Sequence, residues 1–155
     1  MPGGPIEETE MTTPRRASAH FLLAGDSADL PRLQQAIERL PVDAYGQVLI
    51  EIAAPIQVRR LPVPERMSVT WLCREYAGGR HGRLRPRGEL LADAIRAWVA
   101  EWMPDDRVER GLPTVLWIGC PGNERVTALF DELAHRFDHV HPHLGADHRR
   151  PASPS

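Results

Sequence analysis

The chain has 155 residues, of which 42% are apolar and 26% are charged, and its net charge is −2 at pH 7. These values are typical of one globular domain and give no electrostatic reason to expect a nucleic-acid partner. No apolar run is long enough to cross a bilayer, and the acidic, proline-containing start is unlike a secretory signal, so we expect a cytoplasmic protein without membrane insertion.

Apolar runs of strand length alternate with segments of helical spacing between two unpatterned ends. Residues 1–18 and 145–155 are predicted to be disordered tails around a domain at 19–144. Residues 20–24 predict a first strand, and apolar side chains recurring over residues 30–40 predict a helix that ends before Pro41. Residues 47–53 and 68–73 predict the second and third strands.

The second half continues this alternation. Residues 76–88 contain many glycines and arginines and predict a loop. Residues 90–102 predict a helix, 113–119 a fourth strand, 126–133 another helix, and 139–143 a weaker fifth strand. This order predicts a parallel sheet with helices on both faces, whose ligands bind beyond the carboxyl ends of the strands.

The first turn, Gly25-Asp26-Ser27, follows a strand and opens a helix. Its glycine permits a tight turn, and free N–H groups at the helix start would face an anion such as a phosphate. Asp26 or Ser27 can instead cap the helix, and a carboxylate beside a phosphate is unfavourable unless it points away. The turn is therefore either a phosphate site or an N-capped crossover.

Three other loops follow strands. Arg59 and Arg60 follow the second strand, where an arginine can accept a ribose 2′-phosphate; otherwise they are solvated surface charges. Arg74 begins the loop after the third strand. Gly119 and Cys120 follow the fourth, where the backbone would admit a planar ring or let the next helix pack tightly. Cys73 and Cys120 form no C-x-x-C pair and are expected to be buried, reduced thiols.

Three histidines alternate near the end of the chain. In a strand, His139, His141 and His143 would share one face. We expect no metal there, because no fourth ligand is predicted, and the role of these residues stays open. We expect no catalytic residues either, because the sequence has no Ser-His-Asp order, no pocketed pair of carboxylates and no Walker-type loop.

Four ordered segments resemble the C-terminal half of the siderophore-interacting protein family, which are flavin-dependent ferric-siderophore reductases related to ferredoxin reductases. HFLLAGDSADLP is similar to the family's strand and Gly-Asp-x-(Thr/Ser)-Ala-Leu-Pro turn, with Asp29 interrupting the motif. QVLIEIA and LPVPERMSVTWLCR resemble its second and third strands, including a Val-x-Trp-Leu-x-Arg signature at 69–74. LLADAIRAW and VLWIGCPGNERVTALFDEL resemble the helix and the strand-Gly-helix that follow.

This resemblance implies a three-layer α/β/α Rossmann-like domain of the ferredoxin-reductase NAD(P)-binding type, with a mainly parallel five-stranded sheet. It also implies that NADPH or NADH binds so that a flavin on a separate N-terminal barrel takes the hydride. Gly25, Asp26 and Ser27 would then lie at the pyrophosphate, and Gly119 and Cys120 near the nicotinamide.

The sequence departs from the family pattern in three places. The flavin-binding barrel, with its Arg-x-Tyr-(Ser/Thr) motif, is not expected, because only 18 tail-like residues precede the first strand. The family's usual ending, Gly-Tyr-Trp-Arg, is replaced by HPHLGADHRR. The loop after the second strand, commonly acidic in the family, carries Gln57, Arg59 and Arg60.

We therefore predict a stand-alone bacterial siderophore-interacting-type domain that binds NADPH or NADH and serves ferric-siderophore reduction and iron acquisition beside a separate flavin-binding reductase. FAD is not expected to bind this chain alone, so the chain would be at most the NAD(P)H-binding half of an oxidoreductase. The alternative is a non-catalytic interaction domain that keeps the fold and has lost nucleotide binding. Homo-oligomerisation is left open by the sequence.

Overall fold

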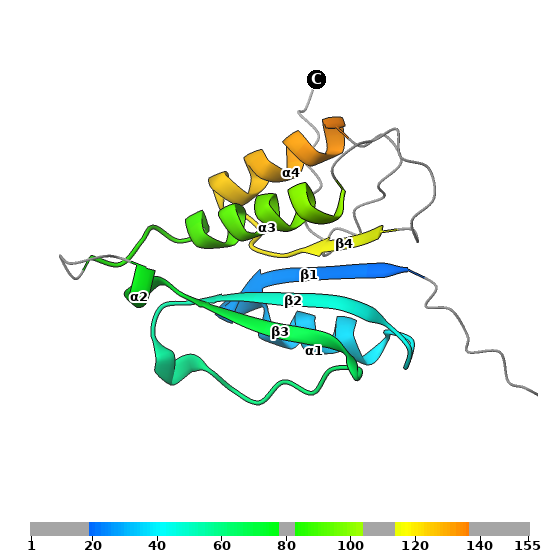
Figure 1. Cartoon of the computed structure of the whole chain (residues 1–155). Coiled ribbons are helices and arrows are strands. Elements are labelled where there is room, and N and C mark those ends of the chain that lie inside the picture. Colours follow the sequence, from blue (N-terminus) through cyan, green and yellow to red (C-terminus); the bar gives the residue numbers. More distant parts are fainter. Residues whose placement is uncertain (1–18, 78–82, 104–113, 137–155) are drawn as a thin grey trace, which may run out of the picture.

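The computed structural model describes residues 19–77, 83–103 and 114–136, which form a sheet between two layers of helices (Figure 1). The strands are β1 (His20–Asp26), β2 (Tyr45–Ile52), β3 (Arg66–Cys73) and β4 (Thr114–Ile118). The helices are α1 (Leu30–Glu38), α2 (Arg74–Ala77), α3 (Glu89–Trp102) and α4 (Glu124–Arg136). Two single turns, η1 (Ser27–Asp29) and η2 (Pro55–Gln57), follow β1 and β2.

The described part of the sheet has the strand order β3-β2-β1-β4, and every neighbouring pair is parallel. The chain builds outward from β1 to β3 and then returns to place β4 on the other side of β1. The carboxyl ends of β1 and β4 therefore form the switch point at which open α/β sheets bind ligands. The predicted fold class is confirmed with four strands, while the fifth predicted strand at 139–143 and the two predicted tails lie outside the described residues.

Two apolar cores cover the two faces of the sheet. Leu22 and Ala24 of β1 face α3 and α4, whereas Leu23, between them, faces α1, as the alternation of a strand requires. Leu33 and Ile37 of α1 pack on that second face. Both faces are covered, which explains why the strands read as nearly continuous apolar runs.

The short helix α2 corrects the predicted loop at 76–88. Tyr76 and Ala77 belong to this helix, whose start is fixed because the Glu75 N–H donates to the Ala53 carbonyl at 3.2 Å. Residues 83–88 have no regular structure, as predicted. No helix in the described ranges is long and apolar enough to cross a membrane.

An aromatic cluster lies at the amino edge of the sheet, opposite the switch point. His20 is 8% exposed and stacks on Tyr45, with ring centroids 4.3 Å apart. Trp98 and Trp102 of α3 approach the same imidazole, with centroids 4.7 Å and 5.0 Å away. Burial lowers the pKa of His20, so the neutral imidazole is the form that suits this site.

Candidate nucleotide-binding site

The predicted site residues all lie at the carboxyl edge of the sheet, but the structure divides them into three places. Ser27, Arg59 and Arg60 line one open groove. Gly25, Asp26, Gly119 and Cys120 surround a buried carboxylate, that of Asp29. Arg74 lies apart from both and is paired with Glu51.

The groove has a volume of about 460 Å³ and runs between α1 and the loop after β2. Its walls mix apolar and polar side chains, the composition expected of a small-molecule site with a few orienting polar groups. The lining residues are Ser27, Ala28, Leu30, Pro31 and Gln34 on one side, and Gln57, Arg59, Arg60, Leu61 and Trp71 on the other.

The loop that carries the two arginines is held by Gln57. The side-chain oxygen of Gln57 accepts the N–H groups of Ala53 at 2.7 Å and Ala54 at 3.1 Å, which fixes η2 to the end of β2. Arg59 and Arg60 come after Val58, which follows η2, and both are exposed. The loop is therefore anchored at its start and presents two cations at the groove.

Arg59 and Arg60 form no ion pair with any carboxylate of the described residues. Other arginines near this edge are engaged: Arg74 with Glu51, Arg85 with Glu89 and Asp93, and Arg87 with Asp26. Guanidinium groups that line the same groove as the indole of Trp71 suit a phosphorylated ligand with a flat ring, because guanidinium matches phosphate and aromatic rings stack.

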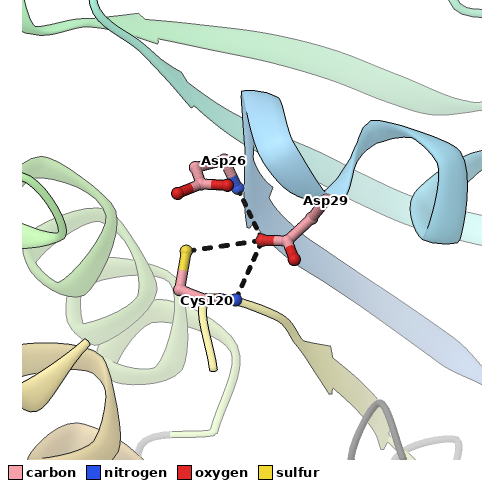
Figure 2. Close-up of side chains that lie close together, drawn as sticks. All are labelled: Asp26, Asp29 and Cys120. Atoms are coloured by element: carbon pink, nitrogen blue, oxygen red, sulfur yellow. Dashed lines mark hydrogen bonds between the residues drawn. The ribbon is translucent and has the colours of Figure 1, made fainter. Parts of the chain in front are cut away.

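Asp29 occupies the switch point between the ends of β1 and β4. Figure 2 shows three hydrogen bonds converging on its Oδ2 atom: from the N–H of Asp26 at 3.0 Å, from the N–H of Cys120 at 2.8 Å, and from the Cys120 thiol at 3.5 Å. The Asp29 side chain is buried. We call this arrangement the Asp29 brace, because it joins the turn after β1 to the loop after β4.

The glycines of the two flanking loops make room for this carboxylate. A Cβ atom at Gly25 would lie 2.9 Å from the Asp29 Cβ, and one at Gly119 would lie 2.6 Å from Oδ2. Both distances are shorter than ordinary van der Waals contact. The side chain of Asp29 therefore already fills the space that the two glycines leave open.

Asp26 caps the first helical turn, so the capping alternative is confirmed for this residue. Its Oδ1 accepts the N–H of Ala28 at 2.9 Å, and its Oδ2 accepts Nε of Arg87 at 2.7 Å. The Asp26 hydrogen bond is also the main cause that raises the pKa of Arg87. The carboxylate is directed to these partners and is buried.

Cys120 is a buried thiol held in a strained backbone conformation. Its φ of 57° lies in the left-handed region, and its side chain is 1% exposed. Burial, followed by the Asp26 and Asp29 carboxylates, raises the pKa of Cys120, so the thiol stays protonated and donates to Asp29. The prediction of a buried, reduced thiol is confirmed for Cys120, whereas Cys73 is unpaired but partly exposed.

Glu51 explains why Arg74 is engaged. This glutamate lies next to the last residue of β2 and is 2% exposed. Its two carboxylate oxygens accept the N–H groups of Gly88 at 2.8 Å and Leu91 at 3.0 Å. It thereby caps the N-terminus of α3, and Nε of Arg74 lies 3.7 Å from Oε1. Arg74 also donates to the Arg85 carbonyl at 3.4 Å.

Asp26, Asp29 and Cys120 each offer a ligand atom, and these atoms lie within 4.8 Å of one another. The Asp29 Oδ2 atom is already the acceptor of three hydrogen bonds, and the thiol is its protonated donor. These contacts explain the cluster as a link between two loops, and we assign no metal to it. The histidines at 139–143 lie outside the described residues.

Sequence reasoning missed three residues that shape this edge. From the sequence, Asp29 stands out only because it interrupts the Gly-Asp-x-(Thr/Ser)-Ala-Leu-Pro motif. A carboxylate one turn after a Gly-Asp pair is nevertheless a capping signal. Glu51 breaks an apolar run of β2, which is a signal of a partnered buried charge. Arg87 gave no signal, because its partner Asp26 is 61 residues away in the chain.

The fold and the groove define an α/β domain with a parallel sheet flanked by helices and a candidate ligand site at the carboxyl edge. A family model described as siderophore-interacting protein matches residues 18–137. The chain belongs to the siderophore-interacting protein family.

Individual relatives match parts of the chain. It is 40% identical over 67 residues to uncharacterised proteins of Mycobacterium tuberculosis and Mycobacterium bovis, covering 43% of this chain and 23% of theirs. A siderophore utilisation protein from T. fusca matches with a TM-score of 0.52 and 25% identity over 77% of this chain and 39% of that one. The siderophore-interacting protein of Acinetobacter baumannii matches with a TM-score of 0.51 and 16% identity over 79% and 42%. The chain thus spans about two fifths of these solved structures.

Proposed function

We propose that this domain binds NADPH in preference to NADH, in the groove between α1 and the loop after β2. It would thereby supply the electron donor for ferric-siderophore reduction and so serve iron acquisition. We further propose that a flavin-binding reductase, approaching the carboxyl edge of this domain, holds the flavin that takes the hydride.

The observation that carries this proposal is that Arg59 and Arg60 line the groove and form no ion pair with a carboxylate in the described part of the chain. NADPH differs from NADH by a 2′-phosphate, and a guanidinium hydrogen bond to a phosphate contributes roughly 1.5–3 kcal/mol when shielded from water. Both arginines are exposed, so we discount this to about 1–2 kcal/mol in total. That is a preference of about tenfold for NADPH.

Exposed apolar side chains support a protein partner at the same edge. Ile56 is 91% exposed and follows β2, and Tyr76 is 75% exposed and follows β3, the neighbouring strand. The hydrogen bond from Glu75 to Ala53 holds the two loops together. Neighbouring exposed apolar side chains of this kind are typical of interaction sites.

Isothermal titration with NADPH and NADH tests the proposal. We expect NADPH to bind about tenfold more tightly than NADH, and the Arg59→Gln/Arg60→Gln double variant to lose that preference. Arg39→Gln removes the same kind of charge from an exposed position at the other end of α1 and should change neither affinity by more than about twofold. No binding of either nucleotide to the wild-type chain would overturn the proposal.

A second candidate function is a non-catalytic interaction domain that has lost nucleotide binding. The buried carboxylates of Asp26 and Asp29 at the turn after β1 favour it, because they oppose an anionic ligand there. On this account, Ile56→Ser and Tyr76→Ser abolish pull-down of the flavin-binding partner, while the Arg59→Gln/Arg60→Gln variant retains it and its function. Loss of function in the arginine variant with the partner still bound excludes this candidate.

A further inference from the structure

We propose that the groove recognises its nucleotide through the 2′-phosphoadenosine end alone, and that the Asp29 brace closes the neighbouring turn to the 5′-diphosphate. This inference rests on the proposed function and names the part of the ligand that the domain holds. The nicotinamide end is then left free to enter the site of a partner protein.

Backbone hydrogen-bond donors of the turn are already engaged by the chain itself. A diphosphate at the end of a parallel strand is normally bound by free backbone N–H groups. Here the N–H groups of Asp26 and Cys120 donate to Asp29, and that of Ala28 donates to Asp26. The chain's own carboxylates have taken the places that phosphate oxygens would occupy.

Charge also disfavours a diphosphate at this turn. Asp26 and Asp29 are each 4% exposed, and their negative charge is partly offset by Arg87, which forms an ion pair with Asp26 and whose pKa both carboxylates raise. A further negative charge about 5 Å from a carboxylate in such a partly shielded site lowers affinity on the order of a hundredfold. The turn therefore repels a diphosphate, whereas the groove mouth with Arg59 and Arg60 attracts a phosphate.

The space beside the two glycines and the starts of α3 and α4 are also occupied by side chains of the chain itself. Gly25 and Gly119 would let a ligand approach the backbone closely, but the Asp29 side chain lies within 3 Å of both Cβ positions. The N-terminus of α3 is capped by Glu51. The N-terminus of α4 is capped by Asn123, whose Oδ1 accepts the N–H groups of Arg125 at 3.1 Å and Val126 at 3.2 Å. Side-chain oxygens therefore already accept N–H groups at the starts of α3 and α4.

The groove itself offers what the remaining part of the ligand needs. Trp71, Leu30 and Leu61 give an apolar surface for a purine ring, and Ser27 and Gln34 add polar groups. The two arginines lie in the same lining and supply the charge for one phosphate. A ribose with a 2′-phosphate and an adenine ring matches this combination, and a 5′-diphosphate adds nothing to it.

Competition between fragments tests this assignment by isothermal titration. We expect adenosine 2′-monophosphate to bind within about fivefold of NADPH, and 5′-ADP, which like NADH lacks the 2′-phosphate, to bind at least about tenfold more weakly than either. NADPH binding more than fivefold tighter than the 2′-monophosphate, or 5′-ADP binding as tightly, would overturn the inference while leaving the proposed function intact. Failure of both NADPH and the 2′-monophosphate to bind would instead reject the proposed function.

Variants of Asp29 provide the second test. In Asp29→Ala and Asp29→Asn, we expect the affinity for 5′-ADP to rise about tenfold or more relative to that for the 2′-monophosphate, because the repelling charge is gone. The asparagine keeps the size and one acceptor oxygen, so it decides the question if the alanine variant does not fold. Asp43→Asn, a charge change in the loop between α1 and β2, should leave the ratio unchanged. An unchanged ratio in Asp29→Asn overturns the inference.

Discussion

Glu51→Ala is expected to destabilise the domain strongly, because one carboxylate holds β2, α3 and Arg74 together. Its removal leaves the N–H groups of Gly88 and Leu91 without their acceptor, at roughly 1–3 kcal/mol each when buried. Arg74 is partly exposed and can rehydrate, so we add little for it. The free energy of unfolding should therefore fall by about 3–5 kcal/mol, a large part of the stability of a domain this size.

Urea denaturation followed by circular dichroism measures this change. Glu51→Gln keeps one acceptor oxygen and should lose about half as much, whereas Glu38→Ala, on the exposed end of α1, should stay within about 0.5 kcal/mol of wild type. A loss below about 1 kcal/mol in Glu51→Ala would show that the cap does not hold α3 to the sheet.

Three further predictions concern other contacts of the fold. Because burial lowers the pKa of His20, the unfolded chain takes up a proton first, so stability should fall as the pH drops below about 6.5. Urea melts at pH 7.5 and 5.5 measure this loss of stability, which should be smaller in His20→Phe than in the wild type. An equal loss in the two proteins would refute the prediction. Native-state thiol labelling at pH 8 should modify Cys73 before Cys120; the reverse order would contradict the burial. Arg74→Gln should change the NADPH affinity less than about twofold in titration, since Glu51 already engages it; a larger loss would make it a ligand contact.

The order of strands and helices could be predicted because each buried element leaves a local signal. Continuous apolar runs indicated strands covered on both faces, and the spacing of Leu33 and Ile37 indicated α1. The short helix α2 gave no such signal, because four residues are too few for a periodicity. Its formation depends on a contact with Ala53, which directly follows a different strand, β2.

The candidate site was predictable as a location but not as an arrangement. The rule that ligands bind at the carboxyl ends of parallel strands identified the correct loops, and the cationic loop at Arg59 and Arg60 lines the groove. The separation of the groove from the Asp29 brace depends on contacts between residues far apart in sequence, such as Asp29 with Cys120. Spacing along the chain carries no information on such pairs. The roles of Gly25, Gly119 and Cys120 toward a nucleotide stay predictions.

The central claim is that the groove with Arg59 and Arg60 binds a nucleotide through its 2′-phosphate. Isothermal titration of the wild-type chain and the Arg59→Gln/Arg60→Gln variant with NADPH and NADH is the most direct measurement. The account predicts a preference of about tenfold for NADPH in the wild type and near-equal affinities in the variant. Equal affinities in the wild type, or a preference that survives the double substitution, would contradict it.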